Sequence, residues 1–324
     1  MKKILVGSLL TVLILSGCSS PDASNNSSSC NPANPPTRIT ENPFGVLYPS
    51  GTFETQSYKS AAEIKAAGFN AVSLGFAFYF NQAGEIVFDR SPDGGEKSRW
   101  LERVKCSVVE AKDAGLITLV WGQFEQVDLP RGTEPMGVPE EIREKLAQGA
   151  IELMPEIAQL LEELKVEYWS PVSELDKFLG YENHNKYFRQ MVEAGSAFEG
   201  ITYAQPMTLS LPPAFVTEKV TPDLGGVDAL SVSWISFDCR PEDMEKALWI
   251  IQQAKDQGVS KIFVGEIGGT QNKSDADQAC FETLIDAFEG KENGVIALDL
   301  PDGIPNGSQV KGTWQETLIT SYVN

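Results

Sequence analysis

The feature that most limits the possible folds of this chain is a repeated phrase: a helical segment, a glycine, then an apolar run with few charges. Runs that are apolar throughout, instead of alternating with polar residues, are typical of parallel strands covered on both faces. Eight such runs joined by helices, in one chain of 324 residues, predict a closed (β/α)8 barrel. The predicted strands are 44–49, 70–80, 116–124, 166–172, 200–207, 228–236, 261–268 and 294–301.

The segments between these runs have the marks of helices. "SYKSAAEIKAAG" ends at Gly68 and "SRWLERVKCSVVEAKDAG" ends at Gly115, and glycine commonly follows the last turn of a helix. The segment 139–165 contains Pro155, which predicts a kink or a break into two helices. An open, doubly wound sheet is the competing fold, but no G-x-G-x-x-G motif follows the first apolar run.

The start of the chain is expected to lie outside the barrel. Lys2 and Lys3 precede "ILVGSLLTVLIL", an apolar run too short for a lasting membrane span, and this arrangement is typical of a signal peptide over 1–17. "LSGC", which ends at Cys18, resembles the lipobox of bacterial lipoproteins. The resemblance implies cleavage before Cys18 and lipidation of its thiol.

Residues 18–38 would then form the lipidated cysteine and a tether, because Ser, Asn and Pro dominate this stretch and little in it can be buried. The barrel domain is expected over 39–324. The protein is expected at the bacterial cell envelope, at the outer membrane or the cell surface, held to the membrane through Cys18. Its formal net charge of −19 repels phosphate backbones, so no nucleic-acid partner is expected.

Histidine and cysteine limit the chemistry further. The only histidine, His184, cannot build a multi-histidine zinc site and is expected to be a packing or helix-surface residue. Besides Cys18 there are four cysteines without metal-type spacing, and an exported protein could pair them. The first choice of disulfide is Cys239 with Cys280. No metal and no cofactor are expected in the chemistry, although Asp clusters could hold a structural calcium ion.

Acidic, amide and aromatic residues gather where the predicted strands end, which is where barrel enzymes place their sites. Aromatic faces can stack on sugar rings, while carboxylates and amides can bond sugar hydroxyls. We therefore expect a polysaccharide or oligosaccharide as the partner. The candidate substrate-binding residues are Tyr48, Trp121, Gln123, Trp169, Ser173, Tyr203, Gln205, Trp234 and Asp299.

Two glutamates stand out among the strand ends. Glu174 follows the fourth predicted strand in "VEYWSPVSELD", and Glu266 ends the seventh in "FVGEIGG". In this respect the chain resembles the clan A glycoside hydrolases, whose members place an acid/base glutamate after strand four and a nucleophile after strand seven. The resemblance implies a retaining glycosidase for a β-linked glycan, with Glu174 as acid/base, Glu266 as nucleophile and no cofactor.

Hydrolysis that retains the anomeric configuration also requires two carboxyls. One protonated carboxyl must donate to the leaving oxygen, and an ionised carboxylate must attack the anomeric carbon from the other face, which sets the two carboxyls roughly 5–5.5 Å apart. Apolar surroundings hold a proton, and Trp169 and Pro171 lie near Glu174 in the sequence. Gly265 and Gly268 let the backbone approach Glu266.

Three other interpretations remain open. "SELD" fits a capping box with Ser173 as N-cap and Asp176 three residues on, so that Glu174 would only open a surface helix. Most clan members carry Asn where this chain has Ser173, and many carry Trp where it reads "ALDLPDG", which favours a non-catalytic glycan-binding lipoprotein. The glycine-rich "GGTQNKS" and "PDGIPNGS" would suit a phosphate-binding barrel enzyme, but the acidic residues beside them oppose an anion.

Overall fold

The protein folds as a closed barrel of eight parallel strands in the computed structural model, which describes residues 30–48, 51–53, 57–91, 93–128, 138–206, 222–234, 241–267, 275–299 and 310–323. Neighbouring strands pair in chain order, and β1 pairs in parallel with both the second and the last, which closes the ring. The (β/α)8 prediction is confirmed. The strands are β1 (Phe44–Tyr48), β2 (Ala71–Phe80), β4 (Ile117–Gln126), β5 (Tyr168–Ser170), β6 (Ile201–Ala204), β7 (Ala229–Trp234), β8 (Lys261–Ile267) and β9 (Val295–Leu298).

One short strand does not belong to the ring. β3 (Ile86–Val87) pairs in the antiparallel direction with the last two residues of β2. This strand was not predicted from the sequence, because two residues are too few to form a recognisable apolar run.

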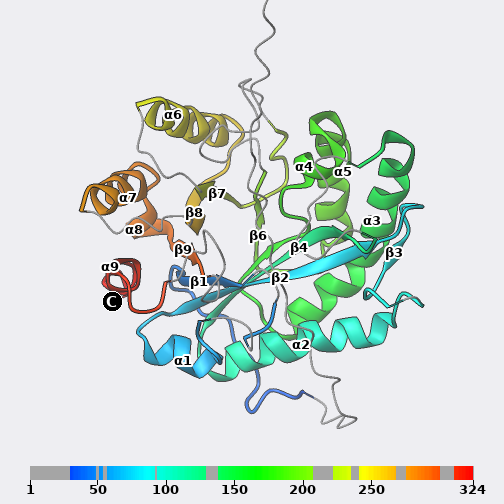
Figure 1. The fold of residues 1–324 in the computed structure, drawn as a ribbon, viewed down its shortest axis with the longest axis horizontal. Coiled ribbons are helices and arrows are strands. Elements are labelled where there is room, and N and C mark those ends of the chain that lie inside the picture. The colour runs from blue at the N-terminus through cyan, green and yellow to red at the C-terminus, as the bar shows by residue number, and fades with distance from the viewer. Residues whose placement is uncertain are drawn as a thin grey trace, which may run out of the picture.

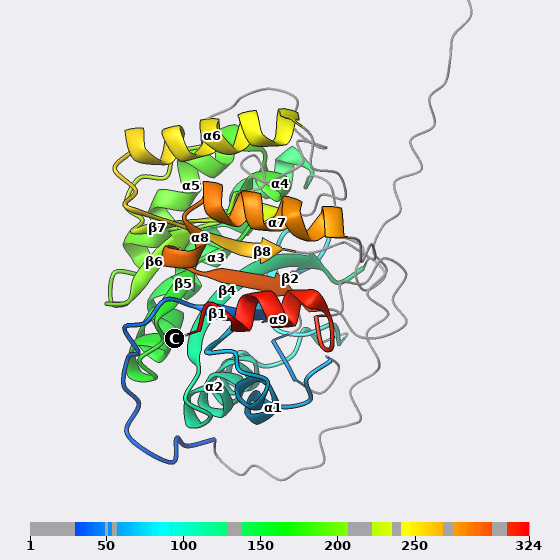
Figure 2. The ribbon, with the colours of Figure 1, turned by 90° about the vertical axis from the view of Figure 1, so that its left-hand side faces the viewer.

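Helices surround the barrel on its outside (Figure 1). Figure 2 shows α6, α7 and α9 in a row along one flank. α3 is a single helix with Pro155 inside it, so the predicted break does not occur: Met154, Ile157 and Leu161 are buried against the core and hold the helix together. The helices are α1 (Ala61–Ala66), α2 (Lys97–Asp113), α3 (Glu140–Glu163), α4 (Leu175–Leu179), α5 (Tyr181–Ala194), α6 (Pro241–Asp256), α7 (Asp275–Ala287), α8 (Gly290–Asn293) and α9 (Trp314–Thr320).

The strands carry two apolar layers because successive side chains point to opposite faces. An inner cluster fills the barrel and an outer, larger cluster lies between the strands and the helices. Tyr168 belongs to the inner cluster, and its neighbour Trp169 belongs to the outer one. The inner cluster consists of Leu47, Ala71, Ile117, Leu119, Trp121, Tyr168, Tyr203, Ala229, Phe263, Ile296 and Leu298.

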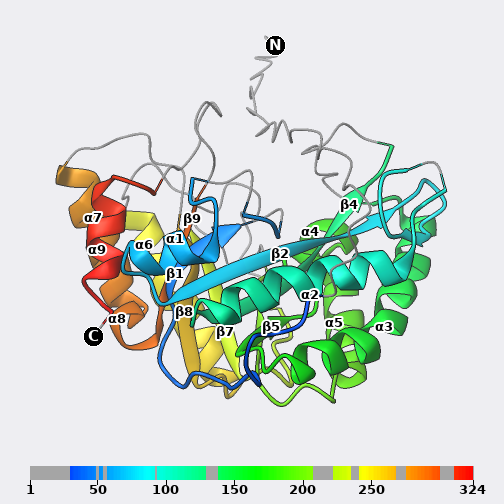
Figure 3. The ribbon, with the colours of Figure 1, turned by 90° about the horizontal axis from the view of Figure 1, so that it is seen from below.

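The segment before β1 covers the end of the barrel from which the strands start (Figure 3). Ile39 packs against the inner cluster. Its N–H donates to Glu167 Oε1 at 2.9 Å, while Glu167 Oε2 accepts from the N–H and hydroxyl of Thr118, each at 2.8 Å. Lys112 forms an ion pair with the same buried carboxylate. A charge buried in this way is stabilised because every lone pair is engaged, and the bonds fasten the segment to the barrel.

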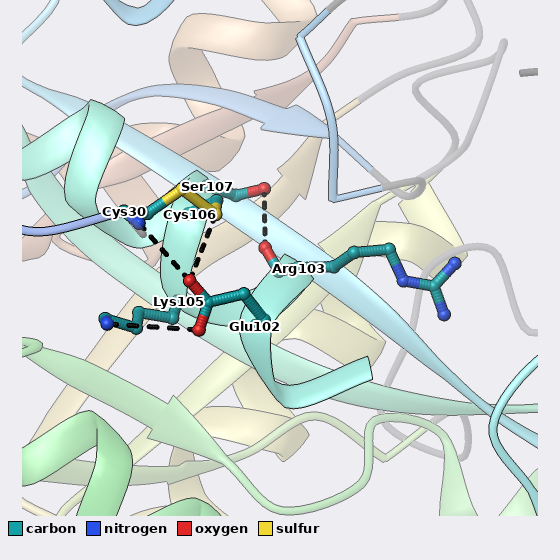
Figure 4. Close-up of a disulfide and its surroundings, with 6 residues drawn as sticks. All are labelled: Cys30, Glu102, Arg103, Lys105, Cys106 and Ser107. Carbon is teal, nitrogen blue, oxygen red and sulfur yellow. Dashed lines mark hydrogen bonds and ion pairs between the residues drawn. A yellow bond between two sulfur atoms is a disulfide. The ribbon is translucent and has the colours of Figure 1, made fainter. Parts of the chain in front are cut away.

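A disulfide ties the same segment to α2. Cys30 is bonded to Cys106, and the Cys30 N–H donates to Glu102 Oε1 at 3.2 Å (Figure 4). The predicted Cys239–Cys280 pairing stays a prediction: Cys280 is disulfide-bonded, and Cys239 lies outside the described residues. Cys18 and the predicted signal peptide also lie outside them. Within the described part of the chain, every helix is too short or too polar to cross a membrane.

Candidate active site

Glu174 stands where β5, the fourth strand of the barrel, passes into α4. It occupies the position before the first helical residue, and its side chain makes no capping hydrogen bond. Its N–H donates to the carbonyl of Gln205 at 2.8 Å, and the N–H of Ser173 donates to the carbonyl of Gly122, also at 2.8 Å. The capping-box interpretation is therefore wrong, because Ser173 is not the N-cap and Glu174 is fixed to β6 instead.

The backbone of Glu174 is left-handed, with φ 52° and ψ 33°. Two other described residues besides glycines have positive φ, Lys165 and Glu289, and both lie just after a helix, where this conformation is common. Glu174 instead follows a strand. The conformation costs about 1–2 kcal/mol for a residue with a Cβ, and such strain is concentrated at functional positions.

β8 contains a β-bulge just before Glu266. Val232 pairs with Val264, but the next residue, Ser233, pairs with Glu266, so β8 contains one extra residue at Gly265. Phe263 belongs to the inner cluster and Ile267, four residues later, to the outer cluster. Strict alternation would put both on one face and would turn Glu266 outward. The bulge therefore turns Glu266 toward the inside of the barrel.

Gln205, at the end of β6, connects the two glutamates. Its carbonyl accepts from the Glu174 N–H, and its side-chain Nε2 donates to Glu266 Oε2 at 3.3 Å and to Ser233 Oγ at 2.8 Å. The hydroxyl of Ser231 donates to Gln205 Oε1 at 3.1 Å, which fixes the orientation of the amide. Ser233 also bonds Glu266. Hydrogen bonds from β6 and β7 thus hold Glu266 in place.

A lysine shares the site with the two carboxyls. Lys177 of α4 lies one helical turn after Glu174, and its Nζ is 3.1 Å from Glu174 Oε2. The two side chains are 7% and 15% exposed, so this pair is shielded from water. Burial lowers the pKa of Lys177 to about 8, while the charge of Glu266 acts in the opposite direction.

Burial also raises the pKa of both glutamates. For Glu174 the charges of Glu266 and then Asp176 raise the pKa further, well above its ordinary value. For Glu266 a hydrogen bond from Ser233 and the charge of Lys177 oppose the rise. Two carboxyls that repel each other cannot both ionise readily, and the hydrogen bonds from Gln205 and Ser233 favour charge on Glu266. The arrangement can therefore offer a proton on Glu174 and a carboxylate at Glu266.

Some of the residues predicted from the sequence do lie at this site. Gln205 is one, although it is only 4% exposed and bonds Glu266. Ser173 precedes Glu174 and is 2% exposed. Gln123 is partly exposed near the end of β4, beside the Gly122 carbonyl that binds Ser173. Trp234 ends β7, and its side chain lies outside the described residues.

Other predicted site residues are packing residues, and these predictions are corrected. Trp169 is 2% exposed and packs edge to face on Phe198 in the outer layer, away from the barrel interior. Tyr203 and Trp121 face the interior but are 1% and 6% exposed, which leaves Tyr203 no free face for a sugar. The Trp121 ring covers Gly75, and its Nε1 donates to Ser73 Oγ at 3.1 Å.

Tyr48 and Asp299 are also structural. Tyr48 is fully buried, and its hydroxyl donates to the carbonyl of Tyr58 at 3.3 Å. Asp299 is fully buried as well and accepts from the N–H groups of Val310, at 3.0 Å, and Ser57, at 3.3 Å. Asp299 therefore ties together the segments that follow β1 and β9, and its oxygens are not available to a ligand.

Three residues of the site were not predicted from the sequence: Lys177, Ser231 and Ser233. The i, i+3 spacing of Glu174 and Lys177 on a short helix was a usable signal. In "ALSVSW" the two serines alternate with apolar residues, and this period of two indicates that both face the same side of the strand.

The described residues contain one group whose donor atoms lie close enough together to hold a metal: Cys30, Glu102 and Cys106. The disulfide engages both sulfur atoms, so this group lacks the thiolates that a soft metal requires. It is also separate from the two glutamates, since it lies on α2 and the N-terminal segment.

No protein-family model matches the sequence, and no curated protein matches it either. Solved structures do match. A GH113 β-mannanase from Alicyclobacillus acidocaldarius has a TM-score of 0.60 at 15% identity, over 87% of this chain and 97% of its own. Another GH113 β-1,4-mannanase has a TM-score of 0.61 at 14% identity, over 87% and 99%. An endoglucanase from Thermotoga maritima has a TM-score of 0.57 at 14% identity, over 86% and 96%. At these identities the likeness establishes the fold: the chain is a (β/α)8 barrel like those of these mannanases and this endoglucanase.

Proposed function

We propose that this protein is a retaining glycoside hydrolase for a β-linked polysaccharide or oligosaccharide, with Glu174 as acid/base and Glu266 as nucleophile. One observation carries the proposal: two largely buried carboxyls lie at the C-terminal ends of the fourth and seventh barrel strands, interact electrostatically, and are joined through Gln205. The fold likeness adds support, because the similar structures are named as mannanases and glucanases.

The proposed reaction has two steps. In the first, Glu266 attacks the anomeric carbon while Glu174 gives its proton to the leaving oxygen, which takes the electron pair of the broken C–O bond. In the second, water attacks the same carbon, Glu174 accepts a proton from it, and the bond to Glu266 breaks with its electron pair returning to that carboxylate. The raised pKa of Glu174 and the donors around Glu266 suit the first step. We keep the prediction that the carboxyls are roughly 5–5.5 Å apart.

A reducing-sugar assay across β-mannans, β-glucans, β-galactans and β-xylans tests the activity. The neighbours named above make β-1,4-mannan and β-glucan the first substrates to try. Glu174→Gln and Glu266→Gln should each abolish release of reducing ends, while the surface variant Glu156→Gln should not. Retention would be read from the anomer first released, by proton NMR. Inversion, or full activity in both active-site variants, would contradict the mechanism.

A glycan-binding lipoprotein without catalysis is the second candidate. It is favoured by Ser173, which stands where most clan members carry Asn and which is buried at 2% exposure. Binding to an insoluble glycan with no reducing ends released from the whole panel would identify this function. In either case we propose that the protein is anchored to the envelope through a lipid on Cys18.

A further inference from the structure

The positive charge of Lys177 conflicts with the role proposed for Glu174 as the acid. An ammonium group 3.1 Å from Glu174 Oε2 favours the ionised form of that carboxyl, yet the acid must hold a proton before the reaction. Burial of both side chains makes the contact stronger than a surface ion pair, so it cannot be discounted as solvent-screened.

Hydrogen-bond roles resolve the conflict. An ammonium group has donors and no acceptor, so Glu174 Oε2 must accept from Lys177 whether Glu174 is neutral or ionised. When Glu174 is neutral, its proton is therefore favoured on Oε1, because an oxygen without a proton is the better acceptor. Lys177 would not remove the acid proton, but it would decide which oxygen presents it.

A count of charges over Lys177, Glu174 and Glu266 also favours a proton on Glu174, and the charge of the buried Asp176 adds to this preference. With a proton on Glu174, a carboxylate at Glu266 and an ammonium at Lys177, the three side chains are neutral together. With both carboxyls ionised they would carry one net negative charge away from water, which is costly. The hydrogen bonds from Gln205 and Ser233 favour the charge on Glu266.

The second half of the proposed reaction reverses the charges. Once Glu266 is a glycosyl ester it is neutral, and Glu174 has given up its proton and is ionised. The ammonium of Lys177 then pairs directly with Glu174 Oε2. One fixed positive charge thus suits both states, and no charged group needs to move.

We propose that Lys177 is a positioning residue that neutralises whichever of Glu174 and Glu266 is ionised in each half of the reaction, and that places the acid proton of Glu174 on Oε1. The role in the cycle rests on the proposed function, whereas the charge relation between the three side chains does not. Neither the resemblance to clan A glycosidases nor the similar structures assign a role to this lysine.

The other groups that face the site must be considered for any dependence on pH. Asp176, next to Lys177 on α4, raises the pKa of Glu174 through its charge. His184 of α5 interacts with Asp176, and burial lowers the pKa of His184, so the imidazole is neutral near pH 7. From β6 and β7 the partners of the pair are Gln205 and Ser233, which do not titrate.

The test compares Lys177→Met with Lys177→Arg and with Lys97→Met, a control at a surface ion pair whose lysine is 45% exposed. Protein labelled with ¹³C at the glutamate carboxyls would be titrated by NMR, with Glu174 and Glu266 assigned from their Gln variants. In Lys177→Met the titration of Glu266 should move up by about one pH unit or more, because it loses a nearby opposite charge. Lys177→Arg and Lys97→Met should leave it within a few tenths of a unit of wild type. An unshifted Glu266 in folded Lys177→Met would overturn the proposal.

Kinetics on a hydrolysed glycan would test the role in the cycle. The acid limb of kcat/KM in Lys177→Met should move up with the Glu266 titration, and kcat should fall about 10- to 100-fold with a smaller change in KM. An effect on packing alone would lower activity at every pH without moving the limb. If wild type hydrolyses no glycan, the proposed function fails, while the NMR titration still decides the charge relation.

Discussion

The side-chain amide of Gln205 donates to Glu266 Oε2 at 3.3 Å, while the carbonyl of the same residue accepts from the Glu174 N–H at 2.8 Å. One residue therefore sets the position of both carboxyls, one through its side chain and the other through its backbone. We therefore expect substitution of Gln205 to lower activity more than the loss of a single sugar contact would.

Gln205→Met keeps the length and volume of the side chain but removes the donor to Glu266. We expect kcat/KM to fall about 10- to 100-fold and its acid limb to move to higher pH, because a carboxylate that loses a donor binds protons more readily. The control is Gln190→Met on the exposed face of α5. A change in KM alone, with the acid limb in place, would mean that Gln205 contacts sugar instead.

Gly265 is the residue that permits the bulge. A Cβ at this position would lie 1.7 Å from Ser231 Oγ, the hydroxyl that orients Gln205. Gly265→Ala should therefore displace Glu266, destabilise the protein by about 1–3 kcal/mol and lower activity about 100-fold or more. Thermal unfolding and the glycan assay measure the two effects.

A second variant removes the Ser231 hydroxyl, which a Cβ at position 265 would meet. Ser231→Gly in the Gly265→Ala background should recover much of the stability but little of the activity, because Gln205 loses its orienting bond. Gly258→Ala is the control, since nothing lies within 4 Å of a Cβ there. Because φ at this position is +80°, the alanine should cost about 1–2 kcal/mol of stability and no activity. Full activity in Gly265→Ala would show that the bulge does not need glycine.

The barrel could be predicted from the sequence, because each strand is an apolar run and each run ends near a helix signal. All eight observed barrel strands overlap the predicted ranges. The faces of the strands were harder to predict. Tyr168 and Trp169 are both large, aromatic and buried, and the alternation of side chains does not reveal which one points inward until one neighbour is placed.

The two glutamates could be found, but the geometry that makes them useful could not. A regular strand from Phe263 to Ile267 would direct Glu266 toward the helices, and one inserted residue reverses it. The left-handed backbone of Glu174 has no signal in the sequence, because glutamate does not favour that conformation. Both are local departures from regular structure that long-range contacts hold in place.

The predicted anchor is tested by Cys18→Ala. If Cys18 carries the lipid, wild type should be found in the membrane fraction, and the variant should be released or remain as an unprocessed precursor of higher mass. Ser19→Ala keeps the lipobox cysteine and should stay in the membrane fraction. Equal amounts of wild type and Cys18→Ala in the membrane fraction, both correctly processed, would contradict lipidation at Cys18.

Removal of metal ions should leave the glycosidase activity unchanged, since the proposed steps move protons and electron pairs between carboxyls, sugar and water. The measurement is activity after treatment with EDTA and gel filtration. Loss of activity that a single divalent cation restores would contradict the two-carboxylate mechanism. A lower melting temperature with normal activity would instead indicate a structural ion.

Asp299 gives a prediction about stability that does not depend on catalysis. Burial raises its pKa to about 6, against the hydrogen bonds from Val310 and Ser57. A carboxyl with a raised pKa contributes stability that is fully present below its unfolded pKa of about 3.9 and is lost as pH rises to about 6. Over the whole titration, from well below the unfolded pKa to well above the folded one, the contribution of Asp299 to the free energy of unfolding should fall by about 3 kcal/mol.

Asp299→Asn removes this pH-dependent contribution to the free energy of unfolding, because the amide does not titrate. The variant should be less stable than wild type at pH 4, because the NH₂ group of Asn would replace an oxygen that accepts from a backbone N–H, and two donors would then face each other. The deficit should shrink by about 2 kcal/mol as pH rises from 4 to 7, because wild type then bears the cost of an ionised, buried carboxylate and the variant does not. Urea unfolding at several pH values measures it. A deficit that stays constant with pH would show that Asp299 ionises as easily in the folded chain as in the unfolded one.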